Sequence, residues 1–376
     1  MKKILKRIFL LMLCMALCAA AFTSCGTDLS EKENETPHTH SFGAWTVTKE
    51  VADGVDGEKE RNCSCGEKET KIIRGVGSEG ISYSLSEDGS YYIVSGIGTC
   101  ADTEIIIPAI YQGKPVKSIG DSAFMGNKTL KKVEVSDSIT EIEPFAFMRC
   151  ASLCSIVISD NVTSIGAYAF KDCEYLTDTV ILDGVVIIED HAFSGCDRMT
   201  SVTFGNGLTT IGAYAFSWCG SLTEIALPKG VTSIGEFAFE RCVGLTDVII
   251  PESVTNLEQH AFEYCSGLKS LTLSKNLTGI REYLVGNCES LTDIVIPEGV
   301  TEIDYWAFYC CTGLTKIDIP NSVTSIGFQA FYHCTDLTSL TFYGTKAQWN
   351  AIKKHSDWKE GSYLKTVVCT DGEIAV

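Results

Sequence analysis

Cysteine is the residue whose spacing in this chain most directly offers chemistry. The sequence has 18 cysteines in 376 residues, and nine of them recur every 23 residues at one position of a repeated pattern. Stacked repeats could bring neighbours close to disulfide range, but the column has an odd number of members, and buried cysteine packs well as a small hydrophobic residue. We therefore predict a ladder of reduced, buried thiols. The column comprises Cys150, Cys173, Cys196, Cys219, Cys242, Cys265, Cys288, Cys311 and Cys334.

A second group of candidate ligands lies nearer the N-terminus. His38, His40, Cys63 and Cys65 have the side chains that zinc prefers, and residues 38–79 contain little apolar material, so a staple would help them fold. One residue separates the two cysteines, whereas zinc knuckles usually have two. Zinc binding and exposed polar residues therefore both stay open. Alternating strand patterns and Asp-Gly turns predict a small β module over 38–79.

The chain lacks the sequence signatures of familiar enzymes. It has no G-x-S-x-G, no H-E-x-x-H and no phosphate loop, and its six histidines are scattered. The formal charge is -18; residues 1–24 hold four basic residues and no acidic one, so without them it becomes -22. Such a charge repels nucleic acid and anionic lipid. We predict no catalysis, no cofactor and no nucleic-acid partner.

The N-terminus has the pattern of an export signal. A basic start precedes an apolar run over residues 8–22, which predicts a signal peptide over 1–24. The following A-F-T-S-C-G resembles a bacterial lipobox, which would make Cys25 the lipidated first residue of the mature protein. A polar, acidic tether over 25–37 would then follow. We expect contact with a membrane only through this lipid.

A repeat of constant length must position all other features. A phenylalanine column recurs every 23 residues without insertion or deletion, preceded by Ile or Leu five residues earlier and followed by the cysteine column. A period of 20 to 29 residues with an L-x-x-L-x-L core is typical of a leucine-rich repeat solenoid, whose repeats fold only by stacking. The column comprises Phe124, Phe147, Phe170, Phe193, Phe216, Phe239, Phe262, Val285, Phe308 and Phe331.

The predicted fold is an α/β repeat. We expect parallel strands on one face, a second short extended piece, and short helical turns such as Glu258 to Cys265 on the other face. Ten repeats would occupy 119–341, between an N-terminal cap over 80–118 and a C-terminal cap over 342–376 that contains an amphipathic helix with Trp349.

Two repeats depart from the pattern. Leu284 and Val285 replace Ala-Phe in the eighth repeat, a roughly volume-conserving exchange that a core tolerates. Thr179 occupies an inward strand position, which predicts a bulge or a hydroxyl bonded to the backbone, and a weak point in the sheet.

Outward strand positions form the candidate binding face. They are mostly small and polar, and strands about 4.8 Å apart would align them in long shallow rows suited to a protein or peptide. Two residues further along each strand, the second row includes Ile249 and Val295. The candidate residues are Asp178, Ser201, Thr203, Glu224, Asp247, Thr272, Asp293, Lys316 and Asp318.

A stripe of aromatic residues recurs two positions before the phenylalanine column. We expect it to cover the outer side of the repeats, either half-packed or open to a partner, with its histidines as packing residues. Its members are Phe145, Tyr168, His191, Tyr214, Phe237, His260, Tyr283 and Trp306.

The repeat unit with A-F-x-x-C, the segment G-I-G-T-C-A-D-T-E-I-I-I-P-A-I-Y-Q-G-K-P-V at 96–116 and the segment G-T-K-A-Q-W-N-A-I at 344–352 resemble the BspA-like leucine-rich repeat proteins. The resemblance covers about residues 80 to 376. It implies a bacterial surface protein that adheres to host, matrix or bacterial proteins, and it transfers no catalytic residue. Two alternatives stay open: a structural surface-layer or scaffold component without a foreign ligand, and a glycan-capture protein.

Overall fold

The computed structural model describes residues 41–376 of the chain. It divides into two compact units, one containing residues 41–43 and Asn62–Glu67, the other containing Ala44–Arg61 and Lys68–Val376. The predictions on Cys25, His38, His40, the signal peptide and the tether concern positions outside the described residues.

A three-stranded sheet lies in the segment predicted as a small β module. Its strand order is β1-β2-β3, and β1 pairs antiparallel with β2. Of the two aspartate-glycine turn signals, Asp53-Gly54 lies between the first two strands and Asp56-Gly57 lies at the start of the second. The strands are β1 (Thr46–Lys49), β2 (Gly57–Asn62) and β3 (Lys68–Ile73).

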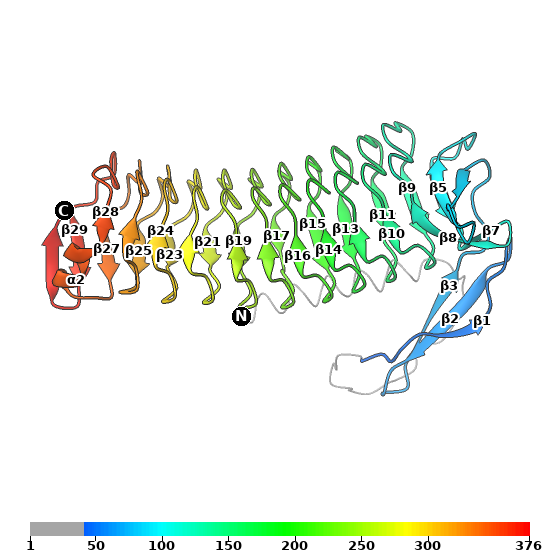
Figure 1. Cartoon of the computed structure of the whole chain (residues 1–376), viewed down its shortest axis with the longest axis horizontal. Helices are drawn as coiled ribbons and strands as arrows, with labels where there is room; N and C mark the ends of the chain where they lie inside the picture. Colours follow the sequence, from blue (N-terminus) through cyan, green and yellow to red (C-terminus); the bar gives the residue numbers. More distant parts are fainter. Residues whose placement is uncertain (1–40) are drawn as a thin grey trace, which may run out of the picture. The chain divides into compact units, whose positions relative to one another are not determined.

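The repeats form a parallel sheet along one side of their coils (Figure 1). Within residues 41–376 this sheet has 13 strands, the last of which runs antiparallel to its neighbour. Neighbouring strands pair with residues 23 positions apart wherever the regular repeat continues. In order from its N-terminal edge it contains β6 (Glu104–Ile107), β9 (Lys132–Val135), β11 (Ser155–Val157), β13 (Asp178–Ile181), β15 (Ser201–Phe204), β17 (Glu224–Ile225), β19 (Asp247–Ile249), β21 (Ser270–Thr272), β23 (Asp293–Val295), β25 (Lys316–Ile319), β27 (Ser339–Phe342), β29 (Thr366–Cys369) and β30 (Gly372–Ala375).

The predicted second extended piece also forms strands, mostly two residues long. Across the described part of the chain these strands lie in a ten-stranded sheet, which also contains strands of the segment predicted as the N-terminal cap, and in a four-stranded sheet. Strands β20 and β22 do not pair. The first sheet contains β4 (Ser82–Leu85), β5 (Tyr92–Gly96), β7 (Ile110–Tyr111), β8 (Lys114–Ile119), β10 (Glu141–Ile142), β12 (Ser164–Ile165), β14 (Ile187–Ile188), β16 (Thr210–Ile211), β18 (Ser233–Ile234) and β20 (Asn256–Leu257). The second contains β22 (Gly279–Ile280), β24 (Glu302–Ile303), β26 (Ser325–Ile326) and β28 (Lys353–Lys354).

The prediction of short helical turns is wrong. The segment from Glu258 to Cys265, like its counterparts in the other coils, forms hydrogen-bonded turns, and α2 (Lys346–Ala351) is the only helix among residues 41–376. That helix lies in the segment predicted to be helical, begins with a capping box at Thr345 and buries Trp349. The chain therefore reverses direction in each coil through turns that are not helical.

Left-handed residues produce these turns. In the coil around Phe170, Tyr168 and Asp172 have φ values of 61° and 59°. The N–H groups of Tyr168, Phe170 and Asp172 donate to carbonyl groups of the next coil at 2.7 to 2.9 Å, whereas those of Ala169 and Lys171 donate three residues back within the turn. A left-handed non-glycine residue costs about 1–2 kcal/mol, so bonding between coils, which a lone repeat lacks, must offset this strain. The positions of Tyr168 and Asp172 are left-handed in the other coils too. Neither position holds a β-branched residue in any coil, and for such residues this conformation is least accessible.

The core follows the predicted columns. Each phenylalanine of the column is buried and stacks on its neighbour at 5.0 to 5.5 Å, except beside Val285, which separates Phe262 from Phe308. Leu284 and Val285 are both buried, so the eighth coil keeps a filled core with a different division of volume.

Thr179 is inward, as predicted, and 1% exposed. The two alternatives expected there, a bulge or a hydroxyl bonded to the backbone, are both wrong, whereas the weak point in the sheet stays a prediction. Strand β13 pairs with β15 in unbroken register, so no bulge forms, and the Thr179 hydroxyl has no hydrogen-bond partner among the described residues. The pleat keeps Thr179 in line with Val202 of the next strand, and burial leaves its hydroxyl without an acceptor.

Candidate binding face of the solenoid

The first outward row of the long sheet is continuous in register. Asp178 pairs with Ser201, Ser201 with Glu224, and Glu224 with Asp247, and the row continues through Ser270 and Asp293 to Lys316. These side chains are exposed, apart from the half-buried Ser201. The structure therefore brings the predicted residues of this row together on one surface.

Four members of that row are acidic, and we call Asp178, Glu224, Asp247 and Asp293 the acidic row. Across residues 41–376, none of the four forms an ion pair. Asp178 accepts hydrogen bonds from the hydroxyl groups of Thr200 and Ser201 at 3.0 and 2.8 Å. Glu224 and Asp247 lie directly side by side, an arrangement of like charges that destabilises a sheet.

The second outward row mixes polar and apolar side chains. Thr203 and Thr272 are exposed, as predicted. Ile249 and Val295 are exposed by 68% and 58%, and together with the exposed Val157 we call them the apolar row. The sequence placed Ile249 and Val295 outward, but they were not among the candidate contact residues. Their signal was a β-branched apolar residue where most repeats have a polar or small one.

Asp318 does not belong to the open surface that was predicted for it. It is 5% exposed, and its Oδ2 accepts from the Lys316 ammonium group at 3.0 Å and from the Tyr343 hydroxyl group at 3.2 Å. Its Oδ1 has no hydrogen-bond partner among the described residues. The side chains of Lys316 and Tyr343 gather round this carboxylate, and no repeat pattern indicates that.

The aromatic stripe is half-buried and closed to face-on contact. Its eight rings stack on one another at 4.1 to 5.3 Å with interplanar angles of 5° to 19°. The histidines are packing residues, as expected: burial, with Lys171 acting in the same direction, lowers the pKa of His191, and Nδ1 of His260 lies 2.8 Å from Oε2 of Glu263. Since neighbouring rings occupy both faces of each interior ring, a sugar cannot stack between them.

A second aromatic feature was missed from the sequence. Arg241 lies between Trp218 and Tyr264, with its guanidinium carbon 4.4 and 4.2 Å from the two ring centroids. All three residues occupy the second left-handed position of consecutive coils, two residues after the phenylalanine column. Comparison of this position from repeat to repeat would have revealed the arginine between two aromatic residues.

The nine cysteines of the ladder are buried and free, as predicted. Each thiol donates to the carbonyl group of the phenylalanine-column residue in the preceding coil, at 3.0 to 3.3 Å. Burial raises the pKa of these thiols, that of Cys219 to about 12. Such cysteines are structural, since the thiolate is the reactive form.

The candidate zinc ligands are only partly covered by the structure. Cys63 is buried and Cys65 is exposed, while both histidines lie outside the described residues. Among the residues described, no three or more His, Cys, Asp or Glu side chains are grouped to hold a metal. Zinc binding by this set stays a prediction.

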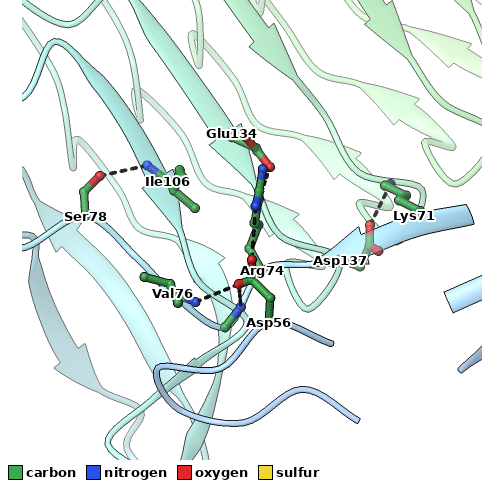
Figure 2. A network of polar contacts seen from close by, with 9 residues as sticks. Asp56, Lys71, Arg74, Val76, Ser78, Ile106, Glu134 and Asp137 are labelled. Atoms are coloured by element: carbon green, nitrogen blue, oxygen red, sulfur yellow. Dashed lines mark hydrogen bonds and ion pairs between the residues drawn. The ribbon is translucent and has the colours of Figure 1, made fainter. Parts of the chain in front are cut away.

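Ion pairs connect the small β module to the first coils (Figure 2). The carboxylate of Asp137 lies 2.9 Å from the ammonium groups of both Lys59 and Lys71. Arg74 contacts Glu134 at 2.6 Å and Asp56 at 3.1 Å. Burial raises the pKa of Asp137, but the two lysines outweigh it and hold that pKa below its usual value.

No helix in the part of the chain that the structure describes is long and apolar enough to cross a membrane. None of the curated proteins matches this chain. Solved structures do. A leucine-rich cell surface protein from Faecalibacterium prausnitzii is 29% identical, with a TM-score of 0.41, over 74% of this chain and 97% of that one.

Two further solved proteins are similar over comparable lengths. A leucine-rich repeat protein from T. pallidum is 20% identical, with a TM-score of 0.41, over 74% of this chain and 96% of that one. The pneumococcal vaccine antigen PcpA is 18% identical, with a TM-score of 0.47, over 79% and 87%. The model of the BspA-type leucine-rich repeat region matches in six copies, over residues 99–208, 186–313 and 267–356. With most of its length matched, the chain belongs to the family of BspA-type leucine-rich repeat proteins.

Proposed function

We propose that this protein binds extracellular protein ligands of a host, of the matrix or of other bacteria through the outward rows of its long sheet. One observation carries the proposal: small and polar side chains stay exposed and in register from strand to strand. Such a surface offers many aligned contacts along a sheet, whereas small-molecule sites are concave, so it suits a protein better than a small molecule. Its role is binding rather than catalysis.

The proposed location is the bacterial cell surface, with a lipid on Cys25 as the anchor. The support is the lipobox-like sequence, together with the surface description of the similar Faecalibacterium prausnitzii protein. Replacing Cys25 with serine should move the protein from the membrane fraction to the medium. Unchanged fractionation of Cys25→Ser would contradict the anchor without affecting the binding proposal.

The binding proposal is tested by blocking the face. Ala226 and Thr272 are exposed on the second outward row, so Ala226→Arg with Thr272→Arg places two large side chains there. The matched control is Thr232→Arg with Thr255→Arg, which changes exposed positions beside β18 and β20. Saturable binding to immobilised matrix proteins, host cells or partner bacteria should be lost in the first variant and kept in the second.

Two outcomes would overturn it. Equal loss in both variants would place the ligand elsewhere. Absence of saturable binding to all three kinds of target, combined with self-association of the purified protein, would favour the scaffold role instead. Glycan capture has less support, because the stacked rings of the aromatic stripe leave no free interior ring face.

A further inference from the structure

We propose that the ligand segment received by the long sheet is positively charged, with lysine or arginine side chains over the acidic row and apolar side chains over Ile249 and Val295. This inference rests on the proposed function, since it names the chemistry of the partner that the same face would bind. The occupant is a basic, amphipathic segment of another protein. Three features of the face support it.

The first feature is uncompensated negative charge. Glu224 and Asp247 are adjacent in register, and no cation among the described residues pairs with any member of the acidic row. Lys316 is next to Asp293 in register, but its ammonium group is held by Asp318 at 3.0 Å. The protein therefore keeps repulsion along this row that a cationic ligand would relieve.

The second feature is a buried acceptor without a donor, at the end of the row. Asp318 is 5% exposed and faces the same side as Val295 and Thr341, its partners in register. Its Oδ1 finds no donor among the described residues, and an unsatisfied buried acceptor costs about 1–3 kcal/mol. The Lys316 side chain is 63% exposed, so an incoming N–H donor can take its place beside the carboxylate and satisfy both oxygens.

The third feature is apolar surface beside the charge. Ile249 lies two residues beyond Asp247 on the same strand, and Val295 two residues beyond Asp293. Each carboxylate of these strands therefore has an exposed branched side chain about 7 Å away on the same face. Charge and apolar surface run as parallel lines across the strands, and an amphipathic segment matches both at once.

The row also sets the size of the ligand segment. Asp178 and Asp293 are five strands apart, about 24 Å at the usual strand spacing. A helix of about 16 residues has that length. The interface would thus be a single segment rather than a large globular surface.

The inference is tested with two synthetic 16-residue peptides, one of lysine and leucine and one of glutamate and leucine in the same order. Fluorescence anisotropy measures their binding to the wild-type protein and to Glu224→Gln with Asp247→Asn and Asp293→Asn. The control carries Glu174→Gln, Glu289→Gln and Asp336→Asn, which remove the same charge from exposed positions outside the strands. This control separates the row from the net charge of the protein.

We expect the lysine peptide to bind wild type and control alike, more weakly at high salt, and to lose about tenfold in affinity to the first triple variant. Ile249→Thr with Val295→Thr should weaken binding as well. Equal affinity for both triple variants, or for both peptides, would overturn the inference. A calcium site would overturn it as well: the first triple variant would then abolish calcium binding at the acidic row and leave peptide binding unchanged.

The inference and the proposed function can fail separately. A natural ligand that is lost with Ala226→Arg and Thr272→Arg, yet binds the uncharged triple variant with unchanged affinity, would keep the binding face and refute its preference for basic partners. Lysine-peptide binding that survives the two arginine substitutions would refute both, because the peptide would then lie elsewhere.

Discussion

The exchange of Ala-Phe for Leu284-Val285 in the eighth coil can be reversed by mutation. Both residues are buried, and Val285 leaves Phe262 and Phe308 each without an aromatic neighbour on one side. Leu284→Ala should open a cavity and cost about 2–5 kcal/mol of unfolding free energy. Val285→Phe should overpack the coil and cost about 1–3 kcal/mol.

The double variant should behave differently from the sum of its parts. Leu284→Ala makes the room that Val285→Phe needs, and the new ring completes two stacks of the kind present in other coils, each contributing about 0.5–1.5 kcal/mol. We expect the double variant to be as stable as wild type or more stable. The coupling free energy between the two sites should then be about 3 kcal/mol or more.

The assay combines denaturant unfolding with hydrogen exchange across β22, because a repeat array need not unfold in one step. The matched control is the opposite exchange in a regular coil, Ala238→Leu with Phe239→Val, which removes two stacks and should destabilise by about 1–3 kcal/mol. A double variant whose cost equals the sum of its singles would refute the reasoning. It would mean that the side chains at 284 and 285 do not compete for the same space in the core.

Four further outcomes are expected. Asp137→Asn should lower hydrogen-exchange protection in β1 to β3 by about 2 kcal/mol or more, since two lysines lose their counter-ion. Because the folded pKa of Asp137 lies below its usual 3.8, the wild-type contribution should be complete above that pH and disappear as pH falls through the folded value. A wild-type contribution that is already lost above pH 3.8 would contradict this. Thr179→Val should raise stability by about 1 kcal/mol in thermal unfolding because it removes an unpaired buried hydroxyl, whereas the exposed control Thr203→Val should change little; destabilisation by Thr179→Val would show that the hydroxyl is satisfied. The ladder cysteines should resist thiol reagents until the protein unfolds, because burial raises the pKa of thiols such as Cys219; rapid modification of the native protein would disprove it. The coils before β20 and those after β22 should differ in hydrogen-exchange protection, because the second line of strands is interrupted there and the C-terminal coils can open as a separate unit. Uniform protection across that junction would count against a separate C-terminal unit.

Several of these features were predictable from the repeat alone. Phe170 and Cys173 are buried because they recur with the period of the coil, and Asp178 and Glu224 are exposed because they alternate with buried strand residues. Inspection of the second row in the same way would have added Ile249 and Val295 to the candidate contacts. The acidic row was thus available from sequence, whereas its lack of counter-ions was not.

The sequence by itself determined the period, the columns of the core and the outward rows, because each depends on side-chain alternation that every coil repeats. Only the tertiary structure decided the turns. Tyr168 and Asp172 are left-handed instead of helical because their N–H groups bond to carbonyl groups of the following coil, which a local pattern does not contain. It likewise decided the burial of Asp318, which depends on Lys316 and on Tyr343, the residue that follows the next strand. Contacts between coils are cooperative, so a repeat read alone specifies which residues meet but not the backbone conformation that stacking makes favourable.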